Sequence, residues 1–184
     1  MNKVKVLCHQ QPNGIYLVFA DGSYVPFDPS HAIDEEVKYI GIIHEGHPFC
    51  VALRDAGEYP LLRSAAKCED DSPYYLRSEC EVLNEWECEE RTKRIQQLGT
   101  DIPLNEGEMI PSLPMLVAMR YWKKRGLDDA LTAAGGEPMS ASGYWSVSEY
   151  SSSDAWYVNF HSGLVVNHTK YSGYVVRPVA AFNL

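Results

Sequence analysis

The chain has 184 residues and a formal net charge of −9, and a single domain of this length can bury roughly 70% of the surface that its unfolded chain exposes. The acidic balance argues against nucleic acid or an anionic membrane surface as partner, because both favour clustered lysine and arginine. The five cysteines are odd in number and lie in the first half, so they define no disulfide framework.

We therefore expect reduced thiols and synthesis in a bacterial cytoplasm. The first residues, MNKVKVLCHQQPNG, lack the apolar run of a signal peptide, and no apolar stretch approaches the roughly 20 residues of a membrane span. No membrane insertion is expected. Nine acids against one base in residues 69–90 are typical of a solvated face.

The first third of the chain predicts two β-hairpins. In GIYLVFADGSYVPFD the Asp-Gly pair at 21–22 separates two β-prone runs, which is a strong hairpin signal. Apolar runs at 39–43 and 49–53 flank a polar turn at 45–46 in the same way.

The middle of the chain predicts helices. Residues 79–98 have helical spacing of apolar side chains, with Gly99 as a stop. A second helix is expected from the cap Ser112, through a proline in its first turn, to basic residues before Gly126. A short third helix is expected at 127–134.

The last forty residues return to strands, with HSG as a hairpin loop in which Gly163 is left-handed and with Pro178 at a bulge or an edge. Strands, then helices, then strands predict a single α+β domain over residues 1–184. The expected strands are 144–148, 156–160, 164–167 and 174–182.

Two short segments resemble metal sites, but neither is complete. His44, His47 and Cys50 in HEGHPFC would need a fourth zinc ligand such as Cys8 or His9, and a polar hairpin tip beside a buried cysteine explains the same residues. Glu137-Pro138-Met139 has methionine where a calcium-binding triplet of lectins has an amide. No metal, no other cofactor and no catalytic residue are predicted.

The tail has an unusual composition. Nine of the 21 aromatic residues and seven serines lie in the 42 residues from Gly143 onward, where charges are few. Tyrosine gives a large contact area at low entropic cost, and serine, glycine and asparagine give adaptable hydrogen bonds, as in antibody binding sites. This composition predicts a ligand-binding surface.

The run YWSVSEY…AWYVNFHSG…VVRPVAAF, preceded by IPSLPMLVAMRYW and ALTAAGG, resembles the variable proteins of diversity-generating retroelements. These share a C-type lectin fold with formylglycine-generating enzymes, and some act as phage receptor-binding proteins. The resemblance implies a C-type lectin-like fold with antiparallel strands, two to three helices and a variable region at about residues 143–182. It also implies that the chain binds an unknown protein or glycan at a cell surface, displayed on a virion or a cell.

The resemblance places fixed scaffold residues at Trp145, Glu149, Trp156, Val158, Phe160, Gly163, Val165, Lys170, Arg177 and Pro178. It places ligand-binding, diversified residues, here called the candidate positions, at Ser151, Ser153, Asp154, Tyr157, His161, Ser162, Leu164, Val166, Asn167, His168, Thr169, Tyr171, Ser172 and Tyr174, with Gly173 between the last two. Mutating the adenines of an AAC codon cannot give Met, Trp, Gln, Lys or Glu, and none of these occurs at the candidate positions.

Strand alternation gives a geometric expectation for this region. Trp156, Val158 and Phe160 are expected to face the core and Tyr157 to face solvent, and in the partner strand Val165 is expected to be buried. Leu164 and Val166 are expected beside Tyr157, with Arg177 beneath this surface.

Two other functions remain open from the sequence. A carbohydrate lectin of fixed specificity would have the same fold, although the calcium triplet is incomplete. An enzyme of the formylglycine-generating kind would need cysteines in the second half of the chain, which has none after Cys88.

Overall fold

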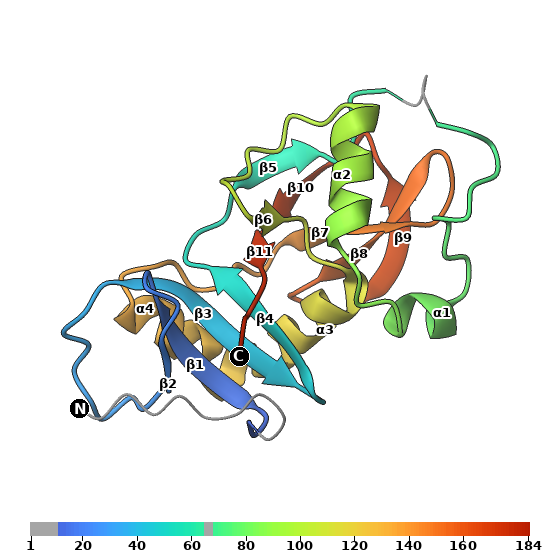
Figure 1. The fold of residues 1–184 in the computed structure, drawn as a ribbon. Helices are drawn as coiled ribbons and strands as arrows, with labels where there is room; N and C mark the ends of the chain where they lie inside the picture. Colours follow the sequence, from blue (N-terminus) through green and yellow to red (C-terminus); the bar gives the residue numbers. More distant parts are fainter. Residues whose placement is uncertain (1–10, 65–67) are drawn as a thin grey trace.

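The computed structural model describes residues 11–64 and 68–184, which form two mainly antiparallel sheets with helices packed against them (Figure 1). This arrangement confirms the predicted α+β class. The first sheet has the strand order β2-β1-β3-β4-β11-β6. Its strands are β1 (Gly14–Phe19), β2 (Tyr24–Pro26), β3 (Val37–His44), β4 (His47–Ala52), β6 (Glu108–Met109) and β11 (Val179–Ala180).

The two predicted hairpins, β1–β2 and β3–β4, are both confirmed in the first sheet, which is covered on both faces. One face contributes side chains such as Ile40 and Phe49 to the main core, while Cys50 and Phe182 belong to a smaller cluster on the other face. This double burial explains why strands of the first sheet are apolar at consecutive positions rather than at alternate ones.

The second sheet contains most of the tail and has the order β5-β10-β7-β8-β9. Only the pairing of β10 with β7 is parallel. Its strands are β5 (Gly57–Pro60), β7 (Gly143–Glu149), β8 (Asp154–Asn159), β9 (Val165–Thr169) and β10 (Gly173–Val176).

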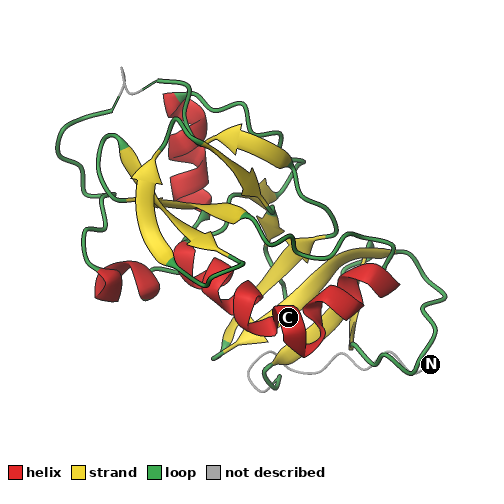
Figure 2. Ribbon diagram, turned by 180° about the vertical axis from the view of Figure 1, so that it is seen from behind, coloured by secondary structure: helices red, strands yellow, loops and turns green. Residues whose placement is uncertain are grey.

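The helices differ from the prediction in two places. The expected helix at 79–98 is two helices, α1 (Glu79–Leu83) and α2 (Glu89–Leu98), because Asn84 closes α1 and its Nδ2 donates to the Cys80 carbonyl at 2.7 Å. The expected second and third helices, α3 (Leu113–Trp122) and α4 (Asp128–Ala133), are joined by a kinked segment, Lys123–Leu127, in which Arg125 and Gly126 have non-helical torsion angles. Figure 2 shows α3 and α4 lying against strands of the first sheet.

Ser112 is at the N-cap position of α3, but its hydroxyl makes no capping bond. The Leu113 amide instead donates to the Ser148 hydroxyl, 3.2 Å away on β7. The start of α3 is therefore attached directly to the second sheet.

Pro178 has a different role from the predicted bulge or edge. It separates β10 in the second sheet from β11 in the first, so the predicted strand 174–182 is two short strands in different sheets. Its carbonyl accepts from the Ala52 amide at 2.9 Å. The chain crosses between the sheets at this proline, next to the buried Arg177.

Candidate functional site

Four aromatic side chains from the second sheet pack together on one of its faces, and we call Trp145, Tyr157, His168 and Tyr174 the aromatic cluster. The rings of Tyr157 and Tyr174 are stacked, with centroids 4.6 Å apart and planes 10° apart. His168 meets the Tyr174 ring edge-on at 5.4 Å, and Trp145 does so at 5.0 Å.

The strand register places some candidate positions on the face of the aromatic cluster and others behind it. Val166 is directly opposite Tyr157 in the β8–β9 pair, so the two share a face, as expected. Asn167 is opposite Trp156, and Thr169 is opposite Asp154. The candidate positions Asp154, Asn167 and Thr169 therefore lie on the reverse face of the sheet, away from the face that carries Tyr157 and Val166.

Burial also corrects the expected geometry. Tyr157 has the predicted orientation, but its side chain is covered by Tyr174 and is only 9% exposed. Val165, expected in the core, is half-buried. Leu164 and Tyr171 are 54% and 42% exposed. The other candidate positions are exposed (His161, Ser162, His168) or half-buried (Ser151, Ser153, Asp154, Val166, Asn167, Thr169, Ser172, Tyr174).

Stacking against Tyr157 affects the ionisation of Tyr174, the more exposed of the two side chains. Burial raises the pKa of the Tyr174 phenol above its usual value, and the neighbouring Tyr157 phenol raises it further. Tyr174 therefore stays neutral throughout the physiological range and offers a ligand an amphipathic ring with a hydroxyl rather than a charge.

At one end of β8 and β9, two loops are joined by Lys170. Its Nζ donates to the carbonyls of Ser151 at 2.7 Å and Ser152 at 3.2 Å, and its amide donates to the Ser153 carbonyl at 2.8 Å. Asp154 accepts from the hydroxyls of Ser151 and Ser153 at 3.0 and 2.6 Å. The candidate positions of the first loop are therefore held in place by the residue that begins the second.

At the opposite end, the turn between β8 and β9 carries His161, Ser162 and Leu164. Asn159 fixes this turn, because its side-chain oxygen accepts from the amides of His161 and Ser162 at 3.0 and 2.9 Å. Gly163 has a φ of +83°, so its predicted left-handed conformation is confirmed.

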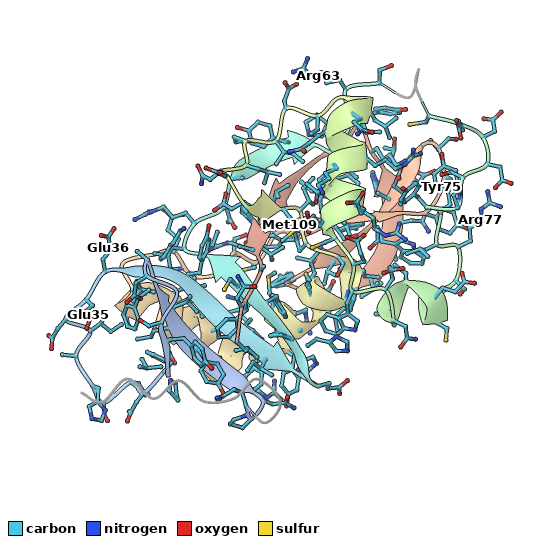
Figure 3. The ribbon with its side chains drawn as sticks, in the orientation of Figure 1. Glu35, Glu36, Arg63, Tyr75, Arg77 and Met109 are labelled. Carbon is cyan, nitrogen blue, oxygen red and sulfur yellow. The ribbon has the colours of Figure 1, made fainter. Side chains whose placement is uncertain are left out.

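Beneath the end that carries Lys170 lies a buried ion-pair network. Glu149 accepts from Lys170 Nζ at 2.6 Å through one oxygen and from Arg94 Nε at 2.8 Å through the other. Lys170 Nζ also lies 5.5 Å from the centroid of the Tyr75 ring, and Tyr75 is labelled in Figure 3. Paired and hydrogen-bonded charges can be buried where single charges cannot, so the network accounts for the burial of Lys170 and Glu149 beneath these loops.

Arg177 was expected beneath the surface around Tyr157, but it lies elsewhere. Its guanidinium donates to the Ala52 carbonyl at 3.0 Å, to the Glu137 carbonyl at 3.1 Å and to the Asp55 carboxylate at 2.6 Å. Burial raises the pKa of Asp55 above its usual value, although Arg177 opposes this shift. Arg177 therefore holds backbone carbonyls at the junction of the two sheets.

Two contributions to this surface were not predicted from the sequence. A β-carbon on Gly163 would lie 2.6 Å from the guanidinium carbon of Arg120, so this exposed arginine of α3 lies across the β8–β9 turn. Strand β5 pairs with β10, and the Tyr59 carbonyl accepts from the Trp145 indole at 3.1 Å. The helical spacing of α3 could have indicated an outward Arg120, but not its contact with a distant turn.

The sequence segments that resemble metal sites are used otherwise in the structure. His47 stacks on Trp86 with centroids 4.1 Å apart, and His44 packs against Tyr121. Cys50 belongs to the core of the first sheet. Within residues 11–64 and 68–184 there is no group of three metal-ligating side chains, whereas Cys8 and His9 lie outside the described residues. Glu137 pairs with Arg54 at 2.5 Å.

Comparison with models of protein families, with curated proteins and with solved structures finds no match to this chain. None of the helices in the described part of the chain is both long enough and apolar enough to span a membrane.

Proposed function

We propose that the chain is a non-enzymatic ligand-binding protein that presents diversified residues on a C-type lectin-like scaffold, as the variable proteins of diversity-generating retroelements do. Its ligand is a protein or a glycan on a cell surface. The chain acts from a virion or from a cell surface, and residues 143–182 are its variable region.

The observation that carries this proposal is the division of burial within the tail. The motif residues Trp145, Glu149, Lys170 and Arg177 are at most 1% exposed, and Trp156 and Phe160 are each 4% exposed. Of the fourteen candidate positions only Tyr157 is buried. Among the other scaffold residues, Val158 and Pro178 are buried and Gly163 and Val165 are half-buried, so burial supports the two roles at most positions.

The dimensions of the surface favour a macromolecular ligand. The candidate positions occupy both ends of β8 and β9 as well as the middle of one face, and a six-residue strand spans roughly 20 Å. The exposed Leu164 and Tyr171 lie at opposite ends of this span. Tyrosine is enriched in protein interaction surfaces.

Sequencing the DNA that flanks the coding region tests the proposal. The expected finding is a reverse-transcriptase gene and a second copy of the segment that encodes residues 143–182. The two copies should differ at codons of the candidate positions, where the second copy has adenine, and should agree at the codons for Trp156 and Lys170. Differences spread equally over both sets of codons, or the absence of the second copy, would favour a lectin of fixed specificity.

A further inference from the structure

A second site is indicated in a cavity between the first sheet and the α3–α4 junction, whose lining includes no residue of the tail. Its volume is about 370 Å³, and Ile15, Phe27, Pro29 and Trp122 form its apolar walls. Pockets for small organic ligands begin at roughly 300 Å³ and are lined mainly by apolar and aromatic side chains. This open cavity is therefore large enough for a small molecule, and its lining combines apolar with charged side chains.

The backbone beside the cavity is kinked between α3 and α4. Within residues Lys123–Leu127, Arg125 and Gly126 have non-helical torsion angles, and Gly126 has a φ of +115°, a conformation that favours glycine. A β-carbon there would also lie 3.3 Å from the Ile15 Cδ1 atom, which is a tight contact. This kinked segment contributes Lys124 and Arg125 to the cavity lining.

The polar groups at the cavity select for a hydrogen-bond acceptor with negative charge. The Trp122 Nε1 atom is buried and has no acceptor among the described residues, and an indole N–H can only donate. Lys124 and Arg125 outnumber the single acid of the lining, Asp129. Arg125 is held by Tyr121, whose carbonyl accepts from Nη1 at 2.8 Å and whose ring centre is 4.1 Å from the guanidinium. Lys124 is therefore the cation more able to move toward a ligand.

We propose that this cavity binds a small carboxylate with a flat apolar body. The body lies against Phe27 and Trp122, and the carboxylate accepts from Lys124 and from the Trp122 indole, which turns its N–H into the cavity on binding. This site is independent of the variable surface, so either proposal can fail without the other.

Two-dimensional NMR of the tryptophan indole groups tests this with 2-naphthoate as the probe and 2-naphthamide as its neutral control. The chain has four tryptophans, and the Trp122→Phe variant assigns the Trp122 signal by its loss. We expect naphthoate to move the Trp122 N–H signal downfield in a saturable manner, with naphthamide binding about tenfold more weakly, since a hydrogen bond to a charged group is worth more than one to a neutral group. Equal binding of the two probes, or no shift of the Trp122 signal, would overturn the proposal.

A charge variant separates the site from general attraction of anions. Lys124 is exposed, so Lys124→Gln should fold normally and weaken naphthoate binding about fivefold. Lys93→Gln, on α2 beside the other sheet (Figure 1), removes the same charge and should leave binding unchanged. Equal weakening by both variants would show that binding depends only on net charge, and this would overturn the proposal.

Discussion

The Lys170 ammonium and the Glu149 carboxylate form an ion pair of 2.6 Å in which both side chains are at most 1% exposed. Neither has access to water, so each depends on the other and on Arg94, Ser151 and Ser152 for its hydrogen bonds. In this way a charge pair of the tail holds the loops at one end of the second sheet.

Removing one partner of this pair should be costly. We expect Lys170→Met to lower the free energy of unfolding by about 3 to 5 kcal/mol, because Glu149 would keep only Arg94 as its charged partner in the interior. Chemical denaturation measures this. Lys93→Met is the matched control, since Lys93 pairs with Glu89 on the surface of α2, and its loss should cost less than about 1 kcal/mol. Equal costs for the two variants would contradict the structural role of the pair.

Tyr157 is buried, so substitution at this candidate position should affect stability. Because the ring is buried against Tyr174 and Trp145, Tyr157→Ala should lower the free energy of unfolding by about 3 kcal/mol. Leu164→Ser, at an exposed position of the same surface, should change it by less than about 0.5 kcal/mol. Thermal melts of both variants give the comparison, and a neutral Tyr157→Ala would show that the stack is not maintained in solution.

The parts of the fold that local chemistry determines could be predicted from the sequence. The Asp-Gly turn at 21–22 and the left-handed Gly163 were found in this way because the residues in the turn determine its conformation. Strand β5 was not predicted, since its four residues carry no alternation and are ordered by pairing with distant β10. Pro178 could be recognised as an interruption, but not as the crossing between two sheets.

The same distinction applies to the candidate site. Residue types identified the buried motif residues and the turn, whereas the coverage of Tyr157 by Tyr174 depends on how β8, β7 and β10 pair. The placement of Asn167 behind the aromatic cluster depends on the register of β8 and β9. The sequence pattern of a single strand predicts neither the coverage of Tyr157 nor the placement of Asn167.

Thiol reactivity should separate the cysteines by burial. Burial raises the pKa values of Cys50 and Cys88 to about 12, so both remain protonated at pH 8 and should resist iodoacetamide, whereas the exposed Cys80 should react. Mass spectrometry of the labelled native protein measures this, with the denatured protein as the control in which all cysteines react. Rapid labelling of Cys88 in the native state would contradict its burial.

The same shifts predict a loss of stability in alkali. A thiol whose pKa is higher in the folded state than in the unfolded state binds its proton more tightly when folded, so unfolding is favoured as the pH rises from about 9 toward 12. Cys50→Ala and Cys88→Ala should each flatten this fall in melting temperature. Cys80→Ala should not change it, and an equal effect of all three substitutions would rule out burial as the cause.

Chelation should leave the fold unchanged. His44 and His47 pack against aromatic rings rather than toward a common centre, so EDTA or a zinc chelator should not change the melting curve or the circular dichroism spectrum. Apo protein with added zinc is the control for reversibility. A chelator-induced fall in melting temperature that zinc reverses would show that a structural metal is bound.

The most direct test of the proposed division of roles is simultaneous randomisation. One library would vary the exposed candidate positions His161, Leu164, His168 and Tyr171, and a matched library would vary the same number of buried motif residues, Trp156, Phe160, Lys170 and Arg177. Resistance to protease during display measures folding in both. We expect most members of the first library to fold, because each exposed substitution costs less than about 0.5 kcal/mol. Few members of the second should fold, because losses of about 3 kcal/mol at each of four sites sum to about 12 kcal/mol, which is comparable with the roughly 5 to 15 kcal/mol that stabilise a typical domain. If the two libraries folded with equal frequency, the buried motif would not be a scaffold and the surface above it would have no special tolerance for diversity.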